Sequence, residues 1–380
     1  MTTLKAVIGA NYGDEGKGRM VDYFASKAEG SCIVVCTNGG AQRGHTVVTD
    51  NGRLHIFHHF GSGTLAGADT YLPATFIVNP IIFMEEYKQL TNCRFIVYVN
   101  PNCLCSTPFD MVVNQIIEES RGANKHGSCG VGIWETILRN GATIGEMLVM
   151  TDEKLRTYLC GVRDTYFIKR LSNKKIDNVR TAWKQVYYSQ GLIEHYINDF
   201  KEMRKHIILE DDNVLFNYEN VIFENGQGLL LDQNIHNSQW STPSNTGSEN
   251  IRKIVDNTFG DNYESFEVCY VTRTYITKHG AGDFPEEIDY LWFDVNRLTE
   301  TNVWNKNQGE FRYGKLNVDE FKRRANEDFD KHLRDTTYAY KTYAITHTDE
   351  YPVFMNNEQT TVYYSFGAER NKVKRLCYST

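Results

Sequence analysis

Short apolar runs that end in polar, glycine-rich turns recur along this chain. They lie at residues 4–8, 32–36, 221–224 and 266–272, with shorter ones at 76–78, 95–99, 343–346 and 361–364. Apolar runs of this length, bounded by turn residues, are typical of buried strands. Amphipathic segments that suit helices follow Lys17 and fill residues 80–90, where a proline opens the segment. The alternation predicts an α/β fold with a large, mainly parallel central sheet and flanking helices.

Two segments depart from this alternation. Residues 151–220 are rich in charge and have helical periodicity, which predicts a helical insertion. Residues 121–145 are polar and rich in glycine, and we expect a long functional loop there. Because the 380 residues suffice for one large domain, we expect a single domain over residues 1–380 that carries this insertion and small subdomains.

The first glycine-rich turn, residues 9–18, carries candidate phosphate chemistry. A strand followed by such a turn and a helix directs backbone N–H groups at a phosphate. Compared with the pattern GxxxxGK[ST], Gly16 and Lys17 fit, but residue 18 is Gly, so the hydroxyl that normally holds magnesium is absent. Asp14 lies inside the loop instead. A P-loop-related cradle with its own carboxylate predicts phosphoryl transfer to a bound substrate, although a glycine-rich turn without function has the same local pattern.

The charge and hydropathy of the chain argue against nucleic acid and membrane as partners. A formal net charge of −7 argues against a general nucleic-acid-binding surface. The densest basic cluster, residues 322–324, is expected on a solvated helix face. No apolar run reaches membrane-spanning length, and the first residues lack a signal-peptide pattern. We therefore expect an intracellular, cytoplasmic protein that binds neither nucleic acid nor membrane.

Polar, glycine-rich turns at 9–18, 38–46, 225–228 and 278–285 each follow a predicted strand. Since the carboxyl ends of parallel strands share one edge of a sheet, we expect side chains from these turns to converge there. The chain carries YGDEGKGR (12–19), GGAQRGHT (39–46), HGSCGVGI (126–133), FENGQG (223–228), STPSNT (241–246) and GAGDFPEE (280–287). In this order they closely resemble WGDEGKGK, GGxNAGHT, GTTGRGIGP, FEGAQG, TSSNT and GAGPFPTE of the adenylosuccinate synthetase family. The match runs from residue 5 to about residue 290 and weakens afterwards.

This resemblance implies a ligase that forms a C–N bond. In that family a nucleoside triphosphate gives its γ-phosphoryl group to the 6-oxygen of a purine monophosphate, and the amine of L-aspartate then displaces the phosphate. By resemblance, Asp14 takes the N1 proton of the purine and binds Mg²⁺ together with the carbonyl of Gly44. Lys17 balances phosphate charge, His45 stabilises charge on the transferring group, and Gln227 binds the purine edge. A homodimer is implied in the same way.

The resemblance also implies a set of nucleotide contacts. They are Gly13, Glu15, Gly16, Gly18, Asn38, Gly40, Gln42, Arg43, Thr46, Ser128, Cys129, Arg139, Thr242, Asp349 and Gly367. Arg139 lies near the arginine that reaches the monophosphate across the dimer interface in the family. Each residue alone also fits a structural role, such as an Asp14 that caps the next helix or a Gln227 that stabilises a turn.

The chain departs from the family pattern where substrates are chosen. The arginine-rich segment GRRRRTGWLD, which binds aspartate and ribose in the family, becomes residues 308–316, with only Arg312 in its middle as an expected aspartate contact. The guanine-reading TKLD becomes THTD at 346–349, which weakens guanine selection by Asp349 and favours ATP or dATP as the donor over GTP. With these changes the chain most resembles the phage branch of the family. Members of that branch join aspartate to dGMP and yield 2-amino-2′-deoxy-N6-succinyladenylate. A viral source implies the host cytoplasm.

Asp14 leaves a second interpretation open, because many of those phage enzymes have Ser or Thr at this position. The ordinary reaction of IMP with GTP therefore stands as an alternative to the reaction of dGMP. From other classes, a catalytically silent nucleotide-binding protein and a generic P-loop NTPase are the competing hypotheses. The joint presence of Asp14, Lys17, His45 and Gln227 disfavours the silent protein.

Overall fold

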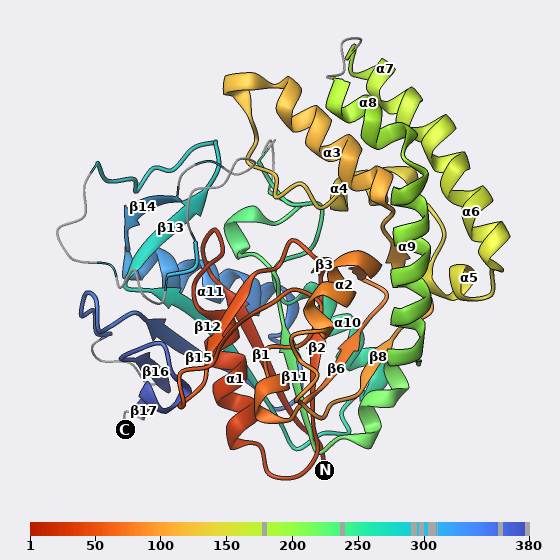
Figure 1. Cartoon of the computed structure of the whole chain (residues 1–380). Helices are drawn as coiled ribbons and strands as arrows, with labels where there is room; N and C mark the ends of the chain where they lie inside the picture. Colours follow the sequence, from red (N-terminus) through yellow and green to blue (C-terminus); the bar gives the residue numbers. More distant parts are fainter. Residues whose placement is uncertain are drawn as a thin grey trace.

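The core of the molecule is a ten-stranded sheet (Figure 1). The computed structural model describes residues 1–176, 181–235, 240–289, 295, 300–302, 309, 311–355 and 360–376. Across the sheet the order is β10 (Ile208–Leu209), β8 (Val97–Val99), β6 (Asp69–Leu72), β2 (Cys32–Cys36), β11 (Asn220–Glu224), β1 (Thr3–Gly9), β12 (Ser265–Arg273), β15 (Ala339–Thr346), β16 (Val362–Ser365) and β17 (Val373–Leu376). All neighbours pair in parallel except β16 and β17, which are antiparallel. The predicted α/β fold with a mainly parallel sheet is therefore confirmed.

Helices cover both faces of this sheet. Met20 and Phe24 of α1 (Lys17–Lys27) belong to the same buried cluster as Val7 of β1. Ala6 and Ile8 of β1 belong instead to the cluster that contains α10 (Glu249–Thr258) and α11 (Val318–His332). Successive strand residues point to opposite faces of a sheet, and here both faces are buried. This explains why the central strands are continuous apolar runs rather than alternating ones.

The chain between residues 152 and 203 is mainly helical. It contains α6 (Asp152–Gly161), a π-helical segment (Val162–Phe167), α7 (Ile168–Asn173), α8 (Thr181–Tyr188) and α9 (Gln190–Met203), which lie together at one end of the molecule (Figure 1). Leu159, Ile193 and Phe200 belong to one buried cluster. That cluster also holds Phe83 of α2 (Pro80–Tyr87) and Phe109 of α3 (Pro108–Ser120). These helices thus share a core with earlier elements, and the division into one 1–380 domain with an insertion at 151–220 stays a prediction.

Residues 121–145 do not form one long loop, so that expectation is wrong. They include a 3-10 turn (Gly122–Asn124), helix α4 (Ile133–Arg139) and the start of α5 (Ile144–Leu148). Gly132, directly before α4, has a φ of 80°, and a Cβ there would lie 2.7 Å from the backbone of Asp110. This glycine permits a helix start and a close backbone approach, which have the same signature in a sequence as a flexible loop.

The described residues also form three smaller sheets. β13 (Tyr275–His279) pairs antiparallel with β14 (Phe311–Lys315), β4 (His45–Val48) pairs with β5 (Leu54–Phe57), and β3 (Gly39–Gly40), β7 (Phe76–Val78) and β9 (Leu104–Cys105) form the third. The strand predicted at 76–78 therefore exists, but outside the main sheet. Among the residues that the structure describes, none of the helices has the length and apolar character required to cross a bilayer.

The basic cluster at residues 322–324 is only partly a solvated face. Arg323 is exposed and pairs with Glu320 and Glu327 on the same helix. Arg324 is 7% exposed, and its guanidinium donates to the carbonyl of Ala10 at 3.0 Å and to Oδ1 of Asn11 at 2.6 Å. The expectation is wrong for Arg324, which connects α11 to the first glycine-rich turn.

Arg324→Met should lower the free energy of unfolding by about 1–3 kcal/mol, because it leaves buried acceptors without a donor. Ala10 and Asn11 are both almost fully buried. Arg323→Met is the matched control and should leave the urea midpoint nearly unchanged, since it removes an exposed ion pair. Urea unfolding of the two variants measures the difference, and equal effects would contradict this role of Arg324.

Candidate active site

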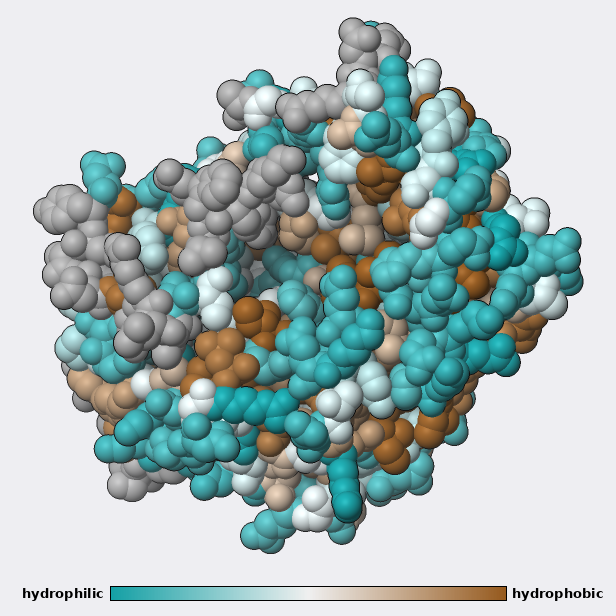
Figure 2. Space-filling model, in the orientation of Figure 1, coloured by the Kyte–Doolittle hydropathy of each residue, from teal (hydrophilic) through white to brown (hydrophobic). Residues whose placement is uncertain are grey.

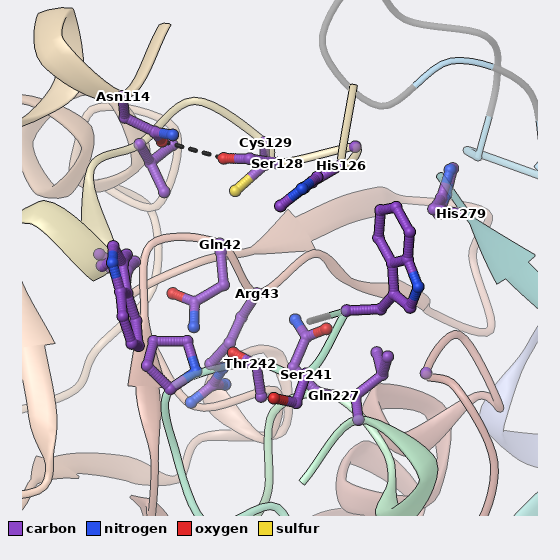
Figure 3. Close-up of a pocket in the computed structure, with 18 of the residues that line it drawn as sticks. Gln42, Arg43, Asn114, His126, Ser128, Cys129, Gln227, Ser241, Thr242 and His279 are labelled. Atoms are coloured by element: carbon purple, nitrogen blue, oxygen red, sulfur yellow. Dashed lines mark hydrogen bonds between the residues drawn. The ribbon is translucent and has the colours of Figure 1, made fainter. Parts of the chain in front are cut away.

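A cavity of about 700 Å³ opens at the carboxyl edge of the sheet, where side chains from all four predicted turns meet (Figures 2 and 3). Its lining includes Gly13, Asp14, Lys17, Gln42, Arg43, Gly44, His45, Ser128, Cys129, Gln227, Thr242, Lys278 and His279. This volume is typical of pockets that bind small molecules. The sequence predicted the convergence, and the elements explain it: β1, β2 and β11 all end beneath the cavity, and β13 forms one wall.

Glu15 holds the first glycine-rich turn together. Its Oε1 accepts the backbone N–H groups of Asn11 at 3.0 Å and Gly13 at 2.9 Å, and its Oε2 lies 2.6 Å from Nζ of Lys17. Gly13 and Gly16 have φ values of 98° and 90°, which favour glycine. Both carboxylate oxygens of Glu15 are thus used inside the loop, so it shapes the cradle and positions Lys17 at the cavity.

Asp14 is half-buried on the cavity side of this turn, in the left-handed region with a φ of 62°. One carboxylate oxygen lies 3.6 Å from Nε2 of His279, and its backbone carbonyl accepts a hydrogen bond from Arg273. Burial raises the pKa of Asp14, while His279, Arg273 and Lys17 oppose that rise. A carboxylate with a raised pKa is a stronger base.

His45 is fixed from behind by a buried charge network. Its Nδ1 lies 2.6 Å from Oε1 of Glu224, and Oε2 of Glu224 accepts from Arg43 at 2.9 Å and from the backbone N–H of Ser62 at 3.0 Å. Although burial alone raises the pKa of Glu224, Arg43 and His45 outweigh it and lower the value to about 2. The ionised Glu224 must accept, so Nδ1 of His45 carries the proton and Nε2 is the other ring nitrogen. Burial lowers the pKa of His45 to about 4.

Glu224 was not predicted as a site residue. The signal was present, because Glu224 is the second residue of the FENGQG motif, but it also reads as the last residue of a strand. Trp240 was missed as well: it lines the cavity beside the STPSNT motif, and its ring lies 4.8 Å from that of His126. Lys278 and His279 begin the predicted turn 278–285, directly before the last motif, but neither residue was assigned a role.

Gln42 and Asn38 come from the same turn and differ in their surroundings. Both amide atoms of Gln42 are buried without a hydrogen-bond partner among the described residues, and Figure 3 shows this side chain inside the cavity. Asn38 donates to the carbonyl of Gly226 at 3.2 Å and accepts its N–H at 2.7 Å. Asn38 therefore joins two of the turns, whereas Gln42 has free polar atoms for a ligand.

The segment that carries Ser128 and Cys129 faces Gln42 across the cavity (Figure 3). Oγ of Ser128 donates to Oδ1 of Asn114 at 3.0 Å and accepts the N–H of Gly130 at 3.2 Å. Burial raises the pKa of the Cys129 thiol to about 11, so it stays protonated at neutral pH. The two side chains present a hydroxyl and a thiol where the family pattern has two threonines.

Several predicted site residues do not line this cavity. They are Glu15, Gly16, Gly18, Asn38, Gly40, Thr46, Arg139, Arg312, Asp349 and Gly367. Gly16, Gly18 and Gly40 instead allow close packing or a left-handed turn, and Oγ1 of Thr46 lies 2.6 Å from Oγ1 of Thr301. Asp349 is exposed on the turn after β15. Residues 308 and 310 of the former arginine-rich segment lie outside the described residues.

Arg139 is held inside its own chain. Its Nε and Nη2 donate to the two oxygens of Asp110 at 2.8 and 2.9 Å, and Nη1 also contacts the hydroxyl of Tyr158. It lines a separate, open cavity with Thr165 and Tyr166. Its predicted reach to the monophosphate of a partner chain stays a prediction.

The predicted magnesium ligands are both at the cavity. The carboxylate of Asp14 and the carbonyl of Gly44 are hard oxygen ligands, and the described residues contain no group of three or more His, Cys, Asp or Glu that could hold a metal by themselves. Mg²⁺ commonly binds one or two protein oxygens and takes its remaining ligands from substrate phosphates and water. The residues present therefore fit this ion.

Curated relatives are similar over most of the chain. The adenylosuccinate synthetase of Microcystis aeruginosa is 28% identical over 302 residues, and that of Prochlorococcus marinus 30% over 298 residues; each match covers 74% of this chain. The matches cover 62% and 63% of those proteins, so the chain spans less than two thirds of their length.

Solved structures of two enzymes share the fold. One is the fully ligated adenylosuccinate synthetase of Plasmodium falciparum, with a TM-score of 0.65, 17% identity and coverage of 98% of this chain and 87% of that one. The other is the succinoaminodeoxyadenylate synthetase of cyanophage S-2L bound to dGMP and dATP, with a TM-score of 0.65, 14% identity and coverage of 98% and 95%. Residues 6–326 match the profile of the adenylosuccinate synthetase family, and the chain belongs to that family.

Proposed function

We propose that this protein is a ligase that joins L-aspartate to C6 of a purine nucleoside monophosphate, at the expense of a nucleoside triphosphate. The observation that carries this proposal is that Asp14, Lys17, His45 and Gln227 line one cavity. A carboxylate base, a cation, an imidazole and an amide are the groups that such a reaction requires. Their presence together also disfavours a silent nucleotide-binding protein.

In the first step Asp14 takes the N1 proton of the purine, and the 6-oxygen becomes the nucleophile. It attacks the γ-phosphorus, the bond from that phosphorus to the β–γ bridging oxygen breaks, and the nucleoside diphosphate leaves. Lys17, which lines the cavity, balances the negative charge of the phosphates in this step. Mg²⁺, when bound by Asp14 and Gly44, neutralises phosphate charge.

In the second step the amine of aspartate attacks C6, and the C6–O6 bond breaks. Inorganic phosphate leaves with the purine oxygen, and the attacking nitrogen loses its extra protons. His45 contributes through Nε2: a phosphoryl group beside it favours the protonated ring, which then donates to the leaving oxygen. Glu224 keeps the ring in the required orientation from its other side.

For the nucleotides we propose dGMP, with ATP or dATP as the donor. The support comes from Gln42 and Arg43, which stand where the family pattern has Asn-Ala before GHT, from the departure at residues 346–349, and from a fold neighbour that was solved bound to dGMP and dATP. His347, which replaces the lysine of the guanine-reading motif, is half-buried with a φ of 62°, and Asp349 is exposed. The reaction of IMP with GTP is the second candidate, because Asp14 matches the ordinary members of the family.

A substrate matrix tests the proposal. The protein is mixed with Mg²⁺ and L-aspartate, and dGMP, GMP and IMP are each crossed with ATP and GTP, with succinylated nucleotide as the readout. We expect the highest kcat/KM for dGMP with ATP. A preference for IMP with GTP would overturn the substrate assignment alone. No succinylated product in any combination would overturn the ligase, and phosphate release without aspartate or purine would favour an NTPase.

A further inference from the structure

Two cations lie directly opposite each other at one wall of the cavity. Lys278 of β13 and Arg312 of β14 are Cα partners in the antiparallel pair, so their side chains share a face of this small sheet. Like charges directly opposite each other on paired strands are destabilising unless something compensates them. Each of the two cations is therefore expected to have a negatively charged partner nearby.

The positive charge of Arg312 is neutralised by a carboxylate of its own chain. Its Nε donates to Oε1 of Glu287 at 2.7 Å, a second nitrogen contacts the other oxygen of Glu287, and Nη1 donates to the carbonyls of Gly280 at 3.1 Å and Gly282 at 2.9 Å. It does not line the cavity. The arginine that sequence analysis assigned to aspartate thus already has a carboxylate partner in its own chain.

Lys278 has no such partner. It is 3% exposed, its ammonium donates to the carbonyl of Ala281, and no carboxylate of the described residues lies within 4.0 Å of it. Burial and the charge of Arg312 lower the pKa of Lys278 to about 8, and the more distant carboxylates of Glu287 and Asp283 oppose this shift only in part. A buried charge without a counter-ion is costly. The face of the Tyr12 ring, 5.6 Å from the ammonium, offsets only part of this cost.

Lys278 lies at the candidate active site. It lines the cavity together with Asp14, Gln227 and Trp240, and Figure 3 shows its neighbour His279 on the opposite side of the cavity from Asn114. Tyr12, beneath the ammonium, is two residues before Asp14. Phosphate groups have their own cation in Lys17, which Glu15 holds in the first turn. Lys278 is a second cation, on a different strand.

We propose that Lys278 binds a carboxylate of the amino-acid substrate, and that Arg312, neutralised by Glu287, supports it from the neighbouring strand. This inference rests on the proposed function, which supplies a dicarboxylic amino acid as substrate. An anion on Lys278 gives the buried ammonium its missing counter-ion and holds the amine of that substrate on the side of the cavity where Asp14 lies. One cation from β13 thereby replaces arginines that the family pattern has at residues 308–316.

Steady-state kinetics of Lys278→Met test the inference, with Lys315→Met as the matched control because Lys315 is exposed on the same strand pair. We expect Lys278→Met to raise the KM for aspartate about 10- to 100-fold, as the loss of a charged hydrogen bond should. The KM values of both nucleotides should stay within about twofold. Lys278→Arg should restore most of the affinity, because it keeps a positive charge.

The pH dependence provides a second readout. In the unsubstituted protein the KM for aspartate should rise above about pH 8, where the ammonium of Lys278 loses its proton. In Lys278→Arg it should stay flat, since a guanidinium remains charged. Lys278→Met should not lower the melting temperature, because it removes an uncompensated buried charge.

Different outcomes separate the two proposals. A higher KM for either nucleotide with an unchanged KM for aspartate would assign Lys278 to a phosphate and overturn the inference, as would no change at all. If the unsubstituted protein makes no succinylated nucleotide, the proposed function fails by itself. Calorimetric titration of aspartate into the protein with mononucleotide then still tests Lys278: binding that Lys278→Met abolishes supports the inference, and no binding, or binding that persists, contradicts it.

Discussion

Asp14→Asn should lower kcat for succinylated nucleotide formation by about 100- to 10,000-fold, the range that loss of a general base produces. Asparagine has nearly the same shape and can keep the unusual left-handed backbone of this residue, whose φ is 62°. It cannot take the N1 proton, so the 6-oxygen does not become a nucleophile. The measurement is kcat with saturating aspartate and the nucleotide pair that the unsubstituted protein prefers.

The control for this loss is Asp50→Asn, because Asp50 is exposed and does not line the cavity. It should leave kcat unchanged. Asp14→Asn should also keep the KM of the mononucleotide within a few-fold, since the proton is transferred in the transition state rather than on binding. Undiminished turnover of Asp14→Asn would remove the assigned base.

Glu224→Gln should destabilise the protein by about 3–5 kcal/mol, because it leaves Arg43 buried without its counter-ion. Both side chains are completely buried, and Nη2 of Arg43 lies 2.9 Å from the carboxylate. The amide also removes the charge that orients His45, so kcat should fall as well. Urea unfolding measures the first effect and the aspartate-dependent reaction the second.

The exposed Glu219 on the approach to β11 offers the control, and Glu219→Gln should have little effect on stability. The double variant Arg43→Met with Glu224→Gln should recover part of the lost stability, since neither buried charge is then left alone. A double variant no more stable than Glu224→Gln would contradict the ion pair as the cause.

The ion pair between Glu224 and Arg43 also predicts that the stability of the protein depends on pH. The pKa of Glu224 is about 2 in the folded protein and 4.5 for an unperturbed glutamate. A lowered pKa contributes stability that is fully present above the unfolded value and is lost as pH falls toward the folded one. The free energy of unfolding should therefore fall between about pH 4.5 and pH 2, and Glu224→Gln should lack this component. Identical acid profiles would contradict the assignment.

The sheet and the turns that form the site could be predicted from local patterns. Apolar runs with turn residues behind them marked β1, β2, β11 and β12, and parallel pairing brings the ends of such strands to one edge. Asp14 and Gln227 were found because they lie in these turns within recognisable motifs. In both cases the residues that reveal the feature lie close together in the sequence.

The missed residues depend on partners far away in the chain. Arg324 belongs to a basic cluster in the sequence, yet it is buried because Ala10 and Asn11, more than 300 residues earlier, accept its hydrogen bonds. Glu224 belongs to the site because it contacts Arg43 and His45, which lie in another turn. No local pattern distinguishes a buried charge from an exposed one when its partners are remote.

The path of the purine oxygen tests the central claim most directly. Mononucleotide labelled with ¹⁸O at the 6-position is turned over with the donor triphosphate and L-aspartate, and the inorganic phosphate is examined by mass spectrometry. If the turns around Asp14 bring the γ-phosphoryl group onto that oxygen, the released phosphate carries the ¹⁸O label. Unlabelled phosphate formed together with succinylated nucleotide would contradict phosphoryl transfer to the purine.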